Sequence, residues 1–184
     1  LDPTVNGQPQ TFTVGLVDST DFSVAGNGIR AAYRPLVLQT GGAEFNGVFT
    51  GLRSDDFSSG SLNPMWTVYD PAGDTAVSTT GTDVQFAIPG VGTHDLWTGR
   101  NKAPRLLQAM SNGDLGIEAK FNSTPTQRFS GHGLVFQADA NNLIRFGVEN
   151  TGTTTRATAT VMVNGQAQML RAKYLESGVP QYLR

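Results

Sequence analysis

The pair Asn164-Gly165 stands between two runs, residues 155–163 and 166–174, in which polar and apolar side chains alternate. Asn-Gly between such runs is the strongest short-range signal of a β-hairpin, because both central residues of the favoured tight turn need a positive φ angle. One alternative stays open, since residues 167–176 also fit a short helix. Helical patterns are otherwise nearly absent, so the sequence predicts a protein made of strands.

Similar alternating runs recur at intervals of about eight to twelve residues, with turn-forming residues between them. This pattern is typical of antiparallel strands that bury one face and expose the other. In one run, Phe146 and Val148 point to one side while Arg145 and Glu149 point to the other. The further predicted strands are residues 11–17, 66–70, 82–89, 115–121, 132–139, 143–150 and 155–163.

Glycine and proline (Gly 22, Pro 9) make up about one residue in six of the 184-residue chain, as expected when many strands are joined by tight turns. We therefore predict an all-β fold, an antiparallel β-sandwich of the jelly-roll type with a short β-rich N-terminal segment. A domain boundary is expected near residue 53. Residues 1–53 would be the end of a preceding domain or a linker, and residues 54–184 a jelly roll that is incomplete at its C-terminus.

Composition also excludes several classes of protein. The chain has no cysteine, which rules out disulfides, thiolate metal sites and a cysteine nucleophile. Its net charge of −2 does not provide the excess of positive charge expected of a nucleic-acid-binding protein. No apolar run is long enough for a membrane span. The first ten residues do not resemble a signal peptide, which fits a mature chain and a piece of a longer precursor equally well.

The segment 93–108 gathers aromatic, charged and amide side chains without a helical or strand period. Sugar-binding sites combine an aromatic ring that stacks on the sugar with several convergent polar groups. This mixture occurs within eight residues, in His94, Asp95, Trp97, Arg100 and Asn101. These residues are therefore candidate ligand contacts.

A purely structural role for the same segment is an equally serious hypothesis. Trp97 would then pack into the core or act as a lid, while Asp95 and Asn101 would shape the turn around Gly99 with side-chain-to-backbone hydrogen bonds. Arg105 would pair with a carboxylate. The sequence does not decide between the two interpretations.

A second polar cluster contains Arg128 in the segment 127–133, together with Gln137, Arg145 and Glu149 on the strands that follow. Arg128 is a candidate ligand contact. A polar sheet face of this kind is more often a solvated surface with weak ion pairs, and we favour that interpretation for the rest of the cluster. We expect His132 to share a strand face with the apolar residues Leu134 and Phe136 rather than to act in catalysis.

From Ser54 onward the sequence resembles the bacterial branch of the concanavalin A-like lectin/glucanase superfamily, close to laminin-G-like jelly rolls and to a family known only as a domain of unknown function. The residues that carry the resemblance are DDFSSGSLNPMWTVYDPAGD (55–74), HDLWTGRNKAPRLLQ (94–108), GDLGIEAKF (113–121), QRFSGHGLVFQADANNLIRFGVE (127–149) and the hairpin at Asn164-Gly165. The resemblance implies two stacked antiparallel sheets, with a concave face that often binds glycans. Residues 1–53 lie outside it, and the chain stops before an aromatic-rich region that such domains usually carry.

The resemblance also bears on catalysis and on metals. Glucanases of this superfamily carry several acidic residues on one strand, whereas the strand around Glu118 offers one, so we expect no enzyme activity. Structural calcium is a candidate because hard cations prefer carboxylate and carbonyl oxygens. Its candidate ligands are Asp55 with Asp56, Asp70 with Asp74, and Asp139 with Asn141 and Asn142.

The sequence therefore predicts a non-catalytic recognition module, extracellular or on a cell surface, that binds carbohydrate around Trp97 and needs no cofactor. The alternative is a structural subunit of a surface layer, filament or multi-domain assembly. Such a subunit would pair its unpaired strand edges with neighbouring domains or with other subunits. A polysaccharide hydrolase or lyase is the least favoured class.

Overall fold

The computed structural model describes residues 52–90, 92–110, 116–176 and 182–184 in full and, outside these ranges, the backbone of Ser111 and of four strands between residues 4 and 32. The described elements are all strands, and every paired strand runs antiparallel to its neighbour. The all-β, antiparallel prediction is confirmed. Among the described residues, none forms a helix that is long and apolar enough to cross a membrane.

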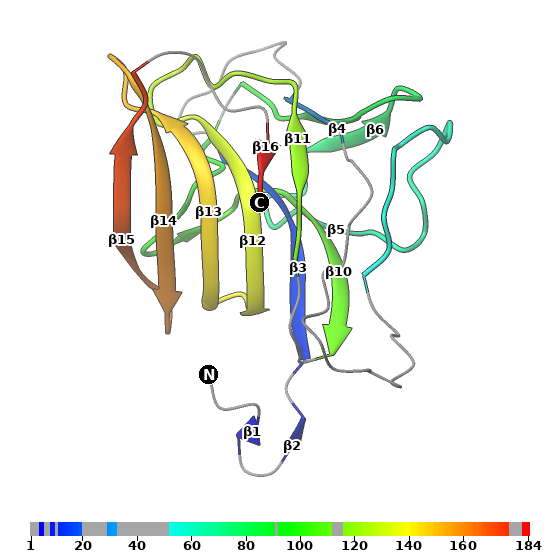
Figure 1. Ribbon diagram of the computed structural model, residues 1–184, viewed down its shortest axis with the longest axis horizontal. Helices are drawn as coiled ribbons and strands as arrows, with labels where there is room; N and C mark the ends of the chain where they lie inside the picture. Colours follow the sequence, from blue (N-terminus) through cyan, green and yellow to red (C-terminus); the bar gives the residue numbers. More distant parts are fainter. Residues whose placement is uncertain are drawn as a thin grey trace.

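Seven strands form the larger sheet, called here the large sheet (Figure 1). In spatial order the strands are β15 (Gln166–Tyr174), β14 (Thr155–Val163), β13 (Asn142–Asn150), β12 (Gly131–Asp139), β3 (Thr11–Ser19), β10 (Arg105–Ser111) and β5 (Thr67–Tyr69). Strands β15, β14, β13 and β12 lie side by side, β3 and β10 follow them, and β5 forms the other edge.

Five shorter strands form a second sheet, called here the small sheet. In spatial order they are β16 (Tyr182–Leu183), β11 (Ala119–Phe121), β4 (Ile29–Ala32), β7 (Val84–Ala87) and β6 (Ala76–Thr79). Two small hairpins complete the described strands: β1 (Thr4–Val5) with β2 (Gln8–Pro9), and β8 (Leu96–Trp97) with β9 (Arg100–Asn101).

Strands from the first part of the chain lie inside both sheets. β3 pairs with β12 on one side and β10 on the other, and β4 pairs with β11 and β7. β3 and β4 lie on the N-terminal side of the boundary expected near residue 53 and pair with strands from beyond it. Each of them is an interior strand of its sheet.

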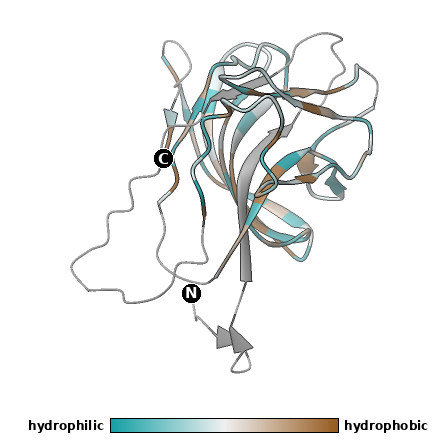
Figure 2. Cartoon of the chain, turned by 90° about the vertical axis from the view of Figure 1, so that its right-hand side faces the viewer, coloured by the Kyte–Doolittle hydropathy of each residue, from teal (hydrophilic) through white to brown (hydrophobic). Residues whose placement is uncertain are grey.

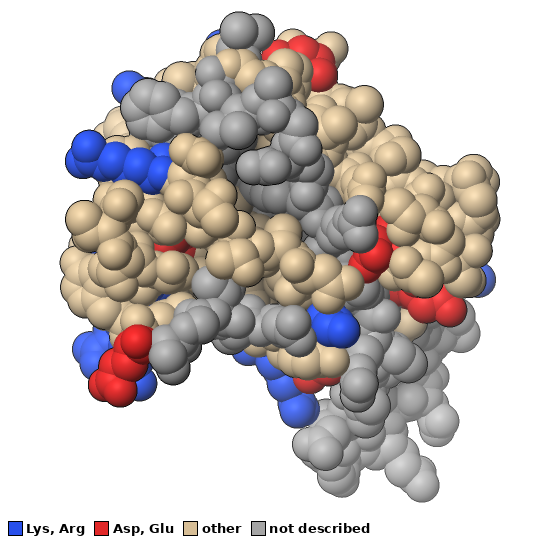
Figure 3. Space-filling model, turned by 90° about the horizontal axis from the view of Figure 1, so that it is seen from above, with Lys and Arg blue, Asp and Glu red and all other residues tan. Residues whose placement is uncertain are grey.

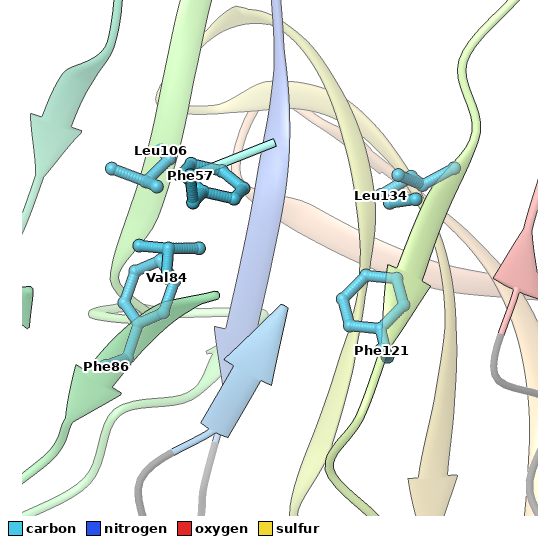
Figure 4. Close-up of a cluster of buried hydrophobic side chains, with 7 residues drawn as sticks. Phe57, Val84, Phe86, Leu106, Phe121 and Leu134 are labelled. Carbon is cyan, nitrogen blue, oxygen red and sulfur yellow. The ribbon is translucent and has the colours of Figure 1, made fainter. Parts of the chain in front are cut away.

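The two sheets share one apolar core (Figure 4). Phe86 of β7 and Phe121 of β11 come from the small sheet, while Leu106 of β10 and Leu134 of β12 come from the large sheet. Phe57, which precedes the first of these strands, is 1% exposed and closes the same cluster. We call the face of the large sheet that joins this core its inner face.

The opposite, outer face of the large sheet carries a second buried cluster. Along β10 and β12, Leu107 and Val135 alternate with the core residues Leu106 and Leu134, so they point to the other side. Figure 2 shows the resulting alternation of hydrophilic and hydrophobic residues along the described strands. The segment that covers this second cluster is 94–103, which contains the ligand contacts predicted around Trp97.

The hairpin expected at Asn164-Gly165 is present. Asn164 has a φ of 51° and Gly165 a φ of 76°, as the predicted turn requires, and the following run is strand β15 rather than a helix. The predicted strands at 11–17, 66–70, 82–89 and 115–121, and the three within 132–163, correspond to β3, β5, β7, β11, β12, β13 and β14. Strand β10 was not predicted, because four consecutive residues from Arg105 to Gln108 are buried and the alternation is lost.

Candidate functional site

The segment 94–103 folds into a hairpin whose turn lies at Thr98 and Gly99. Gly99 has a φ of 69°, a conformation that favours glycine. The carbonyl oxygen of Asp95 accepts hydrogen bonds from the backbone N–H groups of Lys102 (2.8 Å) and Ala103 (3.2 Å), and its Oδ1 accepts one from the N–H of Leu96 (2.7 Å). Asp95 therefore has the turn-shaping role that the structural interpretation gave it.

This hairpin lies on the outer face of the large sheet. Leu96 is 1% exposed and Ala103 is fully buried, and both pack against side chains of β10, β12, β13 and β14, namely Leu107, Val135, Leu143 and Met162. Thr98 Oγ1 accepts a hydrogen bond from the N–H of Ala167 in β15 (2.8 Å), while Asn101 Nδ2 donates to the carbonyl of Ala140, just after β12. The hairpin thus crosses the sheet from β12 to β15 near the end where β12 finishes.

Arg105 is the most deeply buried charged side chain under the hairpin, with no measurable exposure. Its Nη1 donates to Gln137 Oε1 (2.5 Å), its Nη2 donates to Asn101 Oδ1, and its guanidinium lies 4.8 Å from the centre of the Tyr69 ring. Burial lowers the pKa of Arg105 to about 10, which still leaves it charged at neutral pH. The sequence predicted a carboxylate partner, but the structure provides amide oxygens.

The remaining predicted residues of the hairpin occupy different environments. His94 is 2% exposed, and its Nε2 lies 2.8 Å from Asp74 Oδ1. Arg100 is exposed, and its Nη1 lies 3.8 Å from Asp95 Oδ2. Trp97 is half-buried, and because it alternates with Leu96 its side chain points away from the sheet. Trp97 and Arg100 therefore remain accessible, whereas His94 and Asn101 are committed to protein contacts.

Arg128 does not join this group. Its guanidinium lies 4.6 Å from the centre of the Phe129 ring, and its side chain packs beside Gly152. Arg128 precedes the start of β12, whereas Asn101 binds a carbonyl beyond the end of β12. The nine residues of that strand separate the two by about 25 Å.

A second group of polar residues lies at the other end of the outer face, outside the hairpin. The ladder places Gly131, Glu149, Arg156 and Tyr174 in one row across β12, β13, β14 and β15, and Gly133, Gly147, Thr158 and Ala172 in the next row. Residues that share a row point to the same face. We call Glu149, Arg156, Thr158, Ala172 and Tyr174 the candidate site.

One carboxylate organises this site. Glu149 Oε1 accepts a hydrogen bond from Arg156 Nε (2.7 Å) and lies 2.5 Å from its Nη2. Glu149 Oε2 lies 3.5 Å from Arg145 Nη2, and this contact spans Gly147, whose lack of a side chain leaves room for it. Burial lowers the pKa of Arg145, and the nearby charges of Glu149 and Asp95 oppose that shift.

A hollow of about 10 Å³, open to solvent, borders these side chains. Arg145, Glu149 and Thr158 line it together with Gly131, Gly147, His132 and Val148. A volume of this size holds about one water molecule, whereas pockets that enclose drug-sized ligands measure roughly 300 to 1,000 Å³. The hollow therefore does not enclose a sugar ring, and a longer ligand would lie across the face above it.

Sequence reasoning identified Arg145 and Glu149 but missed Arg156, Thr158 and Tyr174. The pairing of Arg156 with Tyr174 could have been a signal, because the register of the 155–174 hairpin places these two residues opposite each other. Gln137, which was grouped with Arg145, binds Arg105 instead. His132 shares the inner face as expected, stacked on Phe121 with 4.4 Å between ring centres.

The acidic residues considered for calcium mostly form turns and local bonds. Asp55 accepts hydrogen bonds from the N–H of Phe57 (2.9 Å) and from Trp66 Nε1 (2.8 Å), and Asp139 binds the amide of Asn142. In the parts of the chain that the structure describes, no group of three or more His, Cys, Asp or Glu residues is placed to hold a metal ion. Seen from above, the charged side chains that are described lie scattered among uncharged ones (Figure 3).

Comparisons with protein-family models, with curated proteins and with solved structures found no match for this chain.

Proposed function

We propose that this protein is a non-catalytic carbohydrate-recognition module with the jelly-roll architecture of the concanavalin A-like superfamily, acting outside the cell or at its surface. Two antiparallel sheets around one core support the architecture. The extracellular location follows from the sequence resemblance alone. The ligand would lie on the outer face of the large sheet, between the hairpin and the free end of β15.

The pairing of Arg156 with Tyr174 is the observation that carries this proposal. The two residues are directly opposite each other in the ladder, and the Tyr174 side chain is 60% exposed. An exposed ring offers an apolar surface for stacking on a sugar, and the adjacent guanidinium offers hydrogen-bond donors to its substituents. Ala172 beside them is small and leaves the approach to the ring open.

Trp97 supplies a second accessible ring on the hairpin that borders the same face. The charge of Asp95 acts on Arg145, which places this part of the hairpin near the candidate site. An oligosaccharide is long enough to contact more than one aromatic residue along such a face. We therefore assign Trp97 and Tyr174 as the two stacking residues.

The charges of the outer face do not favour hydrolysis. Glycosidases generally need two carboxylates that flank the scissile bond. On the described strands of this face the only carboxylate is Glu149, and it is engaged by Arg156 and Arg145. On the hairpin, Asp95 accepts a hydrogen bond from the N–H of Leu96 and lies near Arg100.

The structural-subunit alternative is less well supported, because the described sheet edges oppose strand addition. On the edge strand β15, Leu170 forms a bulge, and Arg171 and Lys173 are exposed. Bulges and cationic residues are devices that protect sheet edges from pairing. The other edges are short: three residues in β5, four in β6 and two in β16.

A glycan array probed with the wild-type chain tests the proposal, followed by titration of the best ligand with variants. We expect Tyr174→Ala and Trp97→Ala each to weaken binding at least about tenfold, which corresponds to roughly 1.4 kcal/mol. Tyr182→Ala is the matched control, because Tyr182 is also exposed (39%) but belongs to the small sheet. The proposal fails if no glycan binds, or if Tyr174→Ala binds as tightly as the control.

A further inference from the structure

We infer that the glycan recognised by the outer face is anionic, and that its carboxylate or sulfate group binds the guanidinium of Arg156. This inference rests on the proposed function and narrows it to acidic sugars. Three observations support it: the excess of guanidiniums over carboxylates on the described strands of the face, the Nη1 group of Arg156, and the pairing of Arg156 with Tyr174.

The outer face has a surplus of positive charge, although the whole chain carries a net charge of −2. Its described strand residues include the guanidiniums of Arg105, Arg145 and Arg156 but only one carboxylate, that of Glu149. On the hairpin, Asp95 lies near Arg100 and influences Arg145. Arg105 is held by neutral amide oxygens below the hairpin, at the other end of the face from Arg156.

Next to Arg156 the excess of guanidiniums over strand carboxylates lies where water screens charge poorly, because Arg145 and Arg156 share the carboxylate of Glu149. The side chain of Arg145 is 9% exposed and that of Glu149 is 16% exposed, so charges interact more strongly here than on an open surface. A bound anion would compensate the excess positive charge. A neutral ligand would remove water from the guanidiniums without supplying a compensating charge. The face therefore favours an acidic ligand over a neutral one of the same shape.

Arg156 is the guanidinium that a ligand can reach. Its side chain is 23% exposed, and its Nε and Nη2 face Glu149. In the described part of the chain, Nη1 has no hydrogen-bond partner. Guanidinium groups bind carboxylate and sulfate-like oxygens through short, charge-assisted hydrogen bonds.

The position of Tyr174 links this donor to a sugar ring. Directly opposed residues on neighbouring antiparallel strands have Cβ atoms about 5 Å apart. A pyranose ring stacked on Tyr174 would therefore hold its ring substituents within reach of Arg156. An acidic substituent satisfies both contacts at once.

Isothermal titration of the full chain with defined hexasaccharides tests this inference. The probes are a galacturonic acid hexamer, a sulfated heparin-derived hexamer and the neutral hexamers of glucose and xylose. We expect at least one acidic hexamer to bind at least ten times more tightly than the neutral ones. A preference for the heparin hexamer, which carries sulfates in addition to carboxylates, over the galacturonate hexamer would indicate that sulfate is recognised.

Arg156→Gln should remove the preference for the acidic hexamer, whereas Arg171→Gln, an exposed β15 residue on the inner face, should keep it. Equal losses in both variants would indicate unspecific attraction and overturn the inference. Tight binding of neutral hexamers by the wild type would overturn it while leaving the proposed function intact. The absence of binding to any glycan would overturn both.

A measurement on the wild-type protein keeps the inference testable if Arg156→Gln does not fold. The affinity for the acidic hexamer should fall between 50 and 300 mM NaCl, because salt screens a charge-based contact. A salt-independent affinity for the acidic hexamer would contradict the inference.

Discussion

Glu149 Oε1 lies 2.5 Å from Nη2 of Arg156 and 2.7 Å from its Nε, so one carboxylate oxygen holds two nitrogens of the same guanidinium. The contact joins β13 to β14, and among the described residues it leaves Nη1 of Arg156 without a hydrogen-bond partner. The same carboxylate also reaches Arg145 across Gly147. Glu149 is thus a positioning residue that fixes the geometry of the candidate site.

Glu149→Gln should lower the free energy of unfolding by about 2 kcal/mol. The substitution removes charge-assisted hydrogen bonds and leaves two guanidiniums close together without their carboxylate. Urea unfolding measures the effect. Glu176→Gln is the control, since Glu176 is exposed and should change stability by less than about 0.5 kcal/mol. Equal effects of the two substitutions would contradict the assignment.

Gly147→Ala should destabilise the large sheet by about 1 to 3 kcal/mol. A Cβ at position 147 would lie 2.5 Å from the carbonyl oxygen of His132, so the backbones of β12 and β13 would have to move apart. Thermal unfolding should show a loss of about 2 to 4 °C per kcal/mol. Gly60→Ala meets no atom within 4 Å and should melt like the wild type. A Gly147→Ala variant that melts with it would disprove the close approach.

Asn101→Ala should act on stability as well as on binding. Its amide bridges Arg105 and the carbonyl of Ala140, so the substitution removes a hydrogen bond to a buried charge and one to the backbone. We expect the free energy of unfolding to fall by about 2 to 3 kcal/mol. Lys102→Ala, at the neighbouring exposed position, is the control. Unchanged stability with lost glycan binding would instead make Asn101 a direct ligand contact.

His132 should make stability depend on pH. Burial lowers its pKa to about 4, from an ordinary value of 6.5, so at pH 5 the unfolded chain binds a proton that the folded chain excludes. The stabilisation is complete above pH 6.5 and is lost as the pH falls toward 4, by about 3 kcal/mol in all. His132→Phe keeps a ring to stack on Phe121 but cannot titrate. Urea unfolding from pH 7 to pH 4 should show a shallower decline for this variant, and parallel curves would refute the assignment.

Much of the large sheet was predictable because polar and apolar side chains alternate along several of its strands. In β13, the apolar inner-face residues Ile144, Phe146 and Val148 alternate with Arg145, Gly147 and Glu149 on the outer face, and Asn164-Gly165 fixes the register of the next hairpin. Strand β10 could not be predicted in this way. The hairpin covers its outer face and the core covers its inner face, so Arg105 and Leu106 are buried alike.

Only Glu149 of the candidate site was singled out in the sequence. His94, Asp95 and Asn101 were predicted as ligand contacts, but their side chains contact Asp74, the local backbone, Arg105 and Ala140. Arg156 and Tyr174 looked like ordinary strand residues. They became a candidate site only when the ladder placed them beside Glu149.

The sequence by itself determined the all-β class, the 155–174 hairpin and the faces of its strands, because alternation and turn chemistry act between residues close in the chain. Only the tertiary structure decided that β3 lies inside the large sheet, that β4 lies inside the small sheet, and that the segment 94–103 covers the outer face. These outcomes depend on contacts between residues far apart in the sequence. A pattern among neighbouring residues does not predict such contacts.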